Sequence, residues 1–264
     1  MNKEHQNQIP PLGETYDQEE HLSIRIFGYF SHLYGERGQS LRDLYQYLRW
    51  VDDVVDESKL TRQQKQEFIA RQISFLTNKD INLEGRYEQE QKIHPVLWSD
   101  TGTIPTQLVR DNIKIAIENM QIDLELSLLN SLCEEKFREY HINTLLPTFE
   151  IIALCLNGKP AKPGSKFAEC LYGANLIATL ADLAEDLGNG KNALPLNELL
   201  TPERFNEMKR YAFGILADNF FSIWDTDMPL KQRLGFYLFF AAALHFYKRK
   251  VQYPKFKQRS ILEA

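Results

Sequence analysis

The chain has 264 residues, of which 43% are hydrophobic and 25% are charged, and its formal net charge is −5. This composition is ordinary for a globular protein with one substantial core, and the net negative charge argues against nucleic acid as the main partner. The three cysteines, Cys133, Cys155 and Cys170, fit no zinc or redox spacing. We therefore expect reduced thiols and a cytoplasmic location.

The N-terminal residues 1–14 are polar and lack the apolar stretch of a signal peptide, so we expect a disordered tail there. No internal repeat and no shift in composition divides residues 15–264, which predicts a single helical domain.

Apolar residues recur with helical periodicity along almost the whole chain, and no segment alternates as a strand would. The pattern predicts an all-α fold with helices near 17–34, 40–57, 61–77, 104–127, 131–157, 164–188, 201–224 and 229–250. Residues 78–92 are charged and rich in glutamine, which predicts a surface connection. Pro147 lies within a predicted helix and indicates either a kink or the meeting point of two shorter helices.

The longest apolar run, Leu234–Leu244, has eleven residues and is too short to span a bilayer. It predicts a buried helix, or alternatively a wall that faces an apolar ligand or rests on a membrane surface.

Two polar stripes far apart in the chain share the spacing i, i+4, i+7 and i+11. The first consists of Tyr45, Arg49, Asp52 and Asp56, and the second consists of Asn175, Thr179, Asp182 and Asp186. At 3.6 residues per turn these offsets return to within about 40° of one line, so each stripe ends in two carboxylates one turn apart. Apolar residues flank both stripes. Carboxylates in such surroundings are rarely buried unless they are paired or bind a metal.

The four aspartates allow two interpretations. Each pair can be an ordinary solvated helix face, because like charges at i, i+4 cost only roughly 0.2–0.5 kcal/mol. Alternatively, two pairs that face each other across a helical core would hold Mg²⁺, which could in turn hold a phosphate. No lysine stands four residues after the carboxylates to neutralise them, and the matched spacing favours an external cation.

An all-α bundle with two facing aspartate pairs suits the ionisation of an allylic diphosphate. Mg²⁺ between the carboxylates and the phosphate oxygens would stabilise the charge that develops as the C–O bond breaks. Arg49, one turn before Asp52, could contact the phosphate directly. The carbocation that remains needs a dry chamber lined by aromatic faces, and the chain has 12 tyrosines and 16 phenylalanines.

Several segments resemble motifs of the squalene/phytoene synthase family. Residues 45–57, YQYLRWVDDVVDE, resemble its first aspartate-rich motif, and residues 182–186, DLAED, resemble its second. Shorter matches are His94-Pro95-Val96-Leu97, Met120 with Asp123, Tyr140, and LPLNEL at residues 194–199. Together the matches extend over roughly residues 23–250, in the order that the family has them.

The resemblance implies an isoprenoid synthase helical bundle with a central cavity, and Mg²⁺-dependent use of prenyl diphosphates such as C15 or C20 substrates. Carried over by motif, the metal ligands would be Asp52, Asp56, Asp182 and Asp186. Tyr45 and Arg49 would line the first diphosphate site. Further substrate-binding positions would be Ser23, Arg25, Tyr140, Asn175 and Thr179.

The second motif departs from the family pattern. Ala178 and Ala181 stand where the family usually has Asn and Arg, and Ala193 stands where it has Tyr. Residues 145–149, LLPTF, replace a small glycine-containing segment. Asn175 and Thr179 could partly substitute as oxygen ligands. These departures predict a product other than squalene or phytoene, formed without an NADPH-dependent second step.

Two functions from different classes follow. The first is a Mg²⁺-dependent prenyltransferase or terpene synthase that couples, transfers or cyclises a prenyl group, with contact to a membrane surface left open. The alternative is a non-catalytic relative that acts in assembly or lipid binding. Retention of all four aspartates favours the enzyme.

Overall fold

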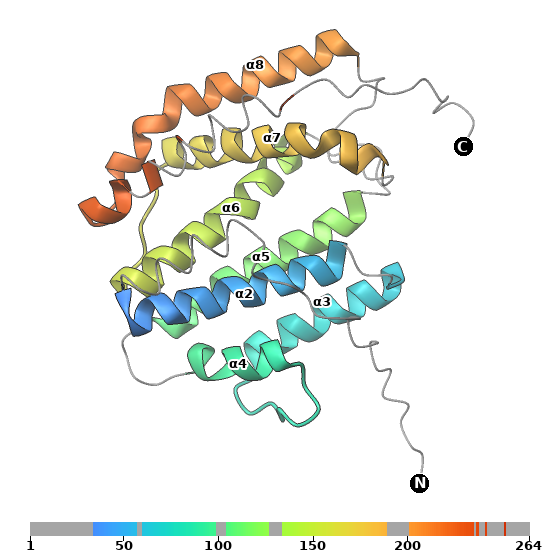
Figure 1. Ribbon diagram of the computed structural model, residues 1–264, viewed down its shortest axis with the longest axis vertical. Helices are drawn as coiled ribbons and strands as arrows, with labels where there is room; N and C mark the ends of the chain where they lie inside the picture. The colour runs from blue at the N-terminus through green and yellow to red at the C-terminus, as the bar shows by residue number, and fades with distance from the viewer. Residues whose placement is uncertain are drawn as a thin grey trace. The chain divides into compact units, whose positions relative to one another are not determined.

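A computed structural model describes residues 34–56, 60–98, 104–126, 134–188, 201–234, 236–237, 241 and 251 (Figure 1). These residues are predominantly helical and contain no strand, which confirms the predicted all-α class. None of the helices among them is both long enough and apolar enough to cross a membrane. The predicted tail and most of the predicted helix over 17–34 lie outside the described residues, and so does most of the predicted helix over 229–250.

With one exception, the helices lie close to the predicted ranges. In chain order they are α2 (Glu36–Asp56), α3 (Arg62–Thr77), α4 (Glu88–Leu97), α5 (Thr106–Leu126), α6 (Glu134–Asn157), α7 (Ser165–Gly188) and α8 (Pro202–Asn219). A 3₁₀ helix, η1 (Phe220–Asp225), follows α8, so the helix predicted over 201–224 is in fact two elements.

Local sequence explains where several helices begin and end. The Thr61 hydroxyl accepts a hydrogen bond from the Gln64 N–H, and the Gln64 side chain caps the Thr61 N–H in return. Thr201 caps α8 in the same way through the N–H of Arg204, with Pro202 at the first helical position. At the end of α6, Gly158 takes a φ of +71°, which glycine adopts without steric cost.

The prediction of a surface connection over residues 78–92 is wrong in its second half, where α4 begins at Glu88. Two buried side chains, Ile93 and Leu97, give α4 an apolar face. Pro95 within this short helix and the run of glutamates and glutamines concealed that pattern. Glu90, which the composition assigned to the surface, is fully buried.

Pro147 does not separate two helices, because α6 runs without interruption from Glu134 to Asn157. The alternative of two shorter helices that meet at residues 145–147 is therefore wrong.

The chain forms two compact units. Unit 1 comprises the residues up to Leu124 together with Pro147–Pro160, and unit 2 comprises Glu125–Leu146 together with the residues from Ala161 onward. Residues 134–146 of α6 thus belong to unit 2 and residues 147–157 to unit 1. The single domain with a central cavity remains a prediction.

In unit 1, α2 packs on α3 and α4 through an aromatic cluster. The Trp50 ring lies 5.3 Å from the ring of Phe68 and 5.2 Å from that of Tyr87, measured between centroids. Trp50 and Phe68 are almost completely buried. This cluster fixes the apolar face of α2 and leaves a different face accessible.

In unit 2, α7 and α8 lie side by side (Figure 1). Gly173 of α7 marks the point of closest approach, since a Cβ atom there would lie 2.9 Å from the Leu216 nitrogen and 3.1 Å from the Ala212 oxygen. The absence of a side chain at this position allows the two backbones to approach so closely.

Candidate functional site

The first stripe lies along the accessible face of α2. Tyr45, Arg49, Asp52 and Asp56 are all half-buried, whereas the apolar residues between them are buried in the core. The predicted line of polar side chains beside a buried helix face is therefore present, and it is accessible from the solvent.

Arg49 joins the carboxylates of this stripe. Its Nη1 lies 2.8 Å from the Asp52 Oδ2, and its Nη2 lies 2.7 Å from the Oδ1 of Asp53, whose side chain is only 6% exposed. No lysine follows the carboxylates at i+4, but Arg49, three residues before Asp52 and four before Asp53, supplies a cation within the stripe itself. The guanidinium fixes the position of the Asp52 carboxylate, and its positive charge offsets the charge of the buried Asp53 carboxylate.

Asp52 and Asp56 suit a magnesium ion that also binds a ligand. Both are half-buried carboxylates one turn apart on the same helix face. Among the described residues, no group of three or more histidine, cysteine, aspartate or glutamate side chains could hold a metal by itself. Mg²⁺ typically binds one or two carboxylates and completes its octahedral shell with water and phosphate oxygens, so Asp52 and Asp56 could contact it only together with such further ligands.

The second stripe lies on α7 in unit 2. Asn175, Thr179 and Asp182 are half-buried, and the neighbouring leucines and Ile177 are buried. Ala178 and Ala181 share this accessible face, so small side chains border the stripe. The side chain of Asp186 lies outside the described part of the structure.

A buried histidine, which the sequence did not indicate, supports the second stripe. The Nδ1 atom of His141 in α6 lies 2.8 Å from the Asn175 Nδ2, and the His141 side chain is completely buried. Its ring packs against Phe137, Tyr140 and Tyr172 at centroid distances of 4.4, 5.1 and 5.9 Å. Burial lowers the pKa of His141 to about 3, so the imidazole is neutral at physiological pH.

The structure assembles the predicted site residues in two groups. Tyr45, Arg49, Asp52 and Asp56 form one line in unit 1. In unit 2, Tyr140 lies next to His141 on α6, and Asn175 contacts His141 from α7. Thr179 and Asp182 continue the line of Asn175 along α7. Ser23 and Arg25 lie outside the described residues. The two stripes belong to different compact units, and their convergence on one cavity remains a prediction.

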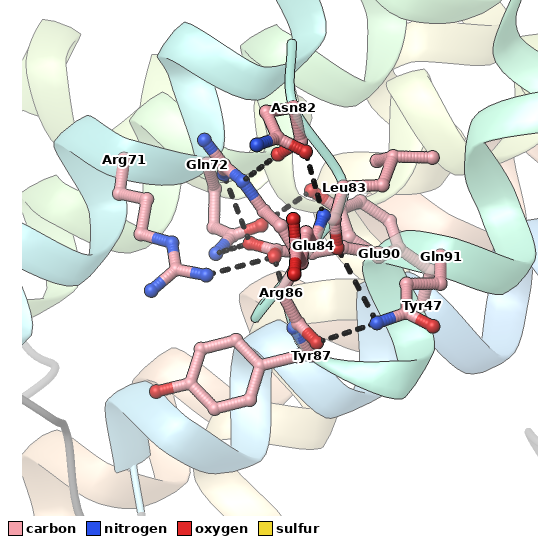
Figure 2. A network of polar contacts seen from close by, with 10 residues as sticks. All are labelled: Tyr47, Arg71, Gln72, Asn82, Leu83, Glu84, Arg86, Tyr87, Glu90 and Gln91. Atoms are coloured by element: carbon pink, nitrogen blue, oxygen red, sulfur yellow. Dashed lines mark hydrogen bonds and ion pairs between the residues drawn. The ribbon is translucent and has the colours of Figure 1, made fainter.

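A buried network around Glu90, which the sequence did not indicate, connects α3 and α4 to α2 (Figure 2). The Glu90 carboxylate is fully buried and accepts hydrogen bonds of 2.9 Å from both Arg71 and Gln72. The Gln72 Oε1 in turn accepts a 2.9 Å hydrogen bond from the Tyr47 hydroxyl of α2. The Tyr87 N–H and the Arg86 guanidinium, at 3.2 and 3.6 Å, complete the surroundings of the carboxylate.

The negative charge in this network is balanced by positive charges. Two guanidinium groups surround one carboxylate, and the Arg71 guanidinium also lies 4.7 Å from the centre of the Tyr87 ring. Burial raises the pKa of the Tyr47 phenol well above its usual range, so the phenol remains a hydrogen-bond donor. Tyr47 lies between Tyr45 and Arg49 in sequence, so the network holds the helix that carries the first stripe.

The two described cysteines play no part in either stripe. Cys155 and Cys170 are free and buried, and burial raises the pKa of both thiols to about 12. They are therefore protonated side chains of the core, and Cys133 lies outside the described residues.

Comparison of the chain with protein-family models, with curated proteins and with solved structures found no match in any of the three. The resemblance to the squalene/phytoene synthase family consequently depends on the motifs themselves.

Proposed function

We propose that the protein binds an allylic prenyl diphosphate through Mg²⁺, ionises it, and then couples, transfers or cyclises the prenyl group. The observation that carries the proposal is the first stripe. Between Tyr47 and Asp56, the second half of α2, every residue is buried except Arg49, Asp52 and Asp56, which lie along one line. A solvated helix face would leave this half of α2 exposed more broadly.

In this proposal the aspartates of both stripes, Asp52, Asp56, Asp182 and Asp186, converge on one cavity and hold Mg²⁺. The bound metal supplies charge stabilisation for the departing diphosphate. Arg49 forms a 2.8 Å ion pair with Asp52. In this proposal the Arg49 guanidinium exchanges Asp52 for a phosphate oxygen when the diphosphate binds. Tyr45, one turn earlier on the same face, borders the diphosphate.

Beside its two aspartates, the second stripe has polar but uncharged side chains and small ones. Its accessible face carries Ala178 and Ala181 beside Asn175 and Thr179, so it has oxygen ligands and space but, within the described part of α7, no cationic side chain on that face. A face without a cation can share the Mg²⁺ of one diphosphate, but it suits an acceptor of another kind better than a second diphosphate. We therefore propose that the reaction does not include an NADPH-dependent reductive step.

The experiment is product analysis with purified protein, Mg²⁺ and C10, C15 or C20 prenyl diphosphates, with and without NADPH. We expect an apolar product that forms without NADPH and that disappears in the Asp52→Asn and Asp182→Asn variants. Asp111→Asn is the matched control, because Asp111 is an exposed helical aspartate that accepts a hydrogen bond from Gln107, four residues before it. Unchanged turnover in both stripe variants would show that these carboxylates are structural.

The alternative, a non-catalytic protein that binds lipid or contributes to an assembly, is favoured by exposed apolar side chains in unit 2. Phe221 and Leu230 are 65% and 63% exposed, and Leu234 is 47% exposed. Side chains of this kind can contact a membrane surface or a partner. Saturable prenyl diphosphate binding without product from any of the three substrates would support this alternative.

A further inference from the structure

The hydrogen bonds between Asn175 and His141 fix the orientation of the Asn175 amide. Its Nδ2 atom lies 2.8 Å from the His141 Nδ1 and 3.4 Å from the His141 backbone oxygen. A backbone carbonyl can only accept a hydrogen bond, so the atom that faces it must be the amide nitrogen. Both acceptors of that nitrogen belong to His141. The Oδ1 atom of Asn175, on the other branch of the amide, consequently points away from the histidine.

The same geometry fixes the tautomer of the histidine. Because Nδ1 accepts from Asn175, the ring proton of the neutral imidazole is on Nε2. The buried Nε2 has no hydrogen-bond partner within the part of the chain that the structure describes. An unsatisfied buried donor costs about 1–3 kcal/mol. A phenylalanine could fill the same aromatic surroundings without this cost, so packing alone does not explain a histidine at this position.

We infer that His141 is a positioning residue, which fixes the amide of Asn175 so that the Oδ1 atom is presented as an oxygen ligand on the second stripe. The inference rests on the proposed function, because the ligand in question is the Mg²⁺–diphosphate group. Amide oxygens are suitable hard ligands for such cations, and Asn175 is half-buried on the same accessible face as Thr179 and Asp182.

A fixed amide matters because a side chain that can rotate must be ordered when a ligand binds. Two hydrogen bonds to His141 impose that order in advance, which is the usual effect of a partner behind a metal ligand. The role of His141 is indirect: it touches Asn175, and Asn175 touches the ligand.

The test is isothermal titration of the full-length protein with inorganic pyrophosphate in the presence of Mg²⁺, alongside unfolding in urea. The variants are His141→Phe, His141→Gln, Asn175→Ala and the double variant His141→Phe/Asn175→Ala. His94→Phe is the matched control, because His94 is also a helical histidine beside aromatic rings but lies in α4. Nitrogen-15 NMR of labelled histidine provides an independent readout of the Nε2–H tautomer.

We expect His141→Phe to weaken pyrophosphate binding about 10–100-fold, as loss of a group behind a metal ligand typically does. Its stability should equal or exceed that of the wild type, because the unsatisfied N–H is removed. His141→Gln should recover part of the affinity, since its amide oxygen can accept from Asn175. In the Asn175→Ala background, His141→Phe should have no further effect, and His94→Phe should leave the affinity unchanged.

Three results would count against these statements in different ways. Wild-type affinity in His141→Phe, or losses that multiply in the double variant, would overturn the positioning role while leaving the proposed function intact. An Nδ1–H tautomer would overturn it on structural grounds. No Mg²⁺-dependent pyrophosphate binding by the wild type would overturn the proposed function and the inference with it.

Discussion

The side chain of Glu90 connects α4 to α3 in unit 1. Its carboxylate is the common acceptor for Arg71, Gln72 and the N–H of Tyr87, and it is completely inaccessible to solvent. A buried ion pair of this kind is a weak source of net stability when intact. Removal of the carboxylate is costly, because the half-buried guanidinium groups of Arg71 and Arg86 lose their counter-charge.

We predict that Glu90→Gln lowers the free energy of unfolding by about 3 kcal/mol, because Arg71 and Arg86 lose their shared counter-charge. Urea denaturation monitored by circular dichroism measures the difference. Glu88→Gln is the matched control in the same helix, since Glu88 pairs with Lys92 at 2.6 Å in an exposed position. That variant should unfold like the wild type. Equal effects of the two substitutions would mean that the buried network contributes no more than a surface ion pair.

At the scale of elements, the close approach of α7 and α8 sets the position of the second stripe. Gly173 permits the contact, whereas Gly214 of α8 has open space beside it, because a Cβ atom added there would meet no atom beyond the adjoining helix backbone within 4 Å. The close helix contact therefore requires glycine at position 173, whereas nothing beside position 214 requires it.

We predict opposite effects of alanine at these two positions. Gly173→Ala should destabilise the protein by about 1–3 kcal/mol, because the new methyl group overlaps the backbone of α8. Gly214→Ala should stabilise it by roughly 0.5–1 kcal/mol, because alanine loses less conformational entropy in a helix. Unfolding curves of both variants check the prediction, and a shift in the same direction for both would contradict the close helix contact.

Periodicity was sufficient to predict most elements, since α2, α3, α5, α6 and α7 each show apolar residues at helical spacing. It failed at α4, where stability depends on Glu90 and on partners from α3 that are remote in sequence. The line of Asn175, Thr179 and Asp182 was predictable because all three lie on one helix. The His141 contact was not, because it joins positions 34 residues apart. The pairing of Arg49 with Asp52 was predictable in principle, because an arginine three residues before a carboxylate lies on the same helix face.

At the scale of the whole molecule, the two stripes belong to different compact units. Under the proposed function, one ligand engages Asp52 of unit 1 and Asp182 of unit 2. A ligand that requires both residues stabilises both units together, by about 2.7 kcal/mol at one hundred times its dissociation constant.

We predict that Mg²⁺ with pyrophosphate slows hydrogen exchange in α3 of unit 1 and in α8 of unit 2, although neither helix carries a proposed ligand. Exchange followed by mass spectrometry measures both helices in one experiment. Chelation of Mg²⁺ with EDTA should abolish the effect, and Asp182→Asn should abolish it in both units. Protection confined to α3 would mean that the first stripe binds the ligand by itself.

The course of α6 through both units has a consequence for synthesis on the ribosome. Unit 1 includes Pro147–Pro160, so it cannot be completed until the chain has been made to residue 160, and by then the part of α6 that belongs to unit 2 has already been synthesised. Domains that are contiguous in sequence fold one after another as they emerge, from the N-terminus onward. Here the units are interleaved, so a nascent chain that ends near residue 124 lacks a segment of unit 1. We therefore expect that neither unit can be exchanged or expressed as one uninterrupted piece of the gene.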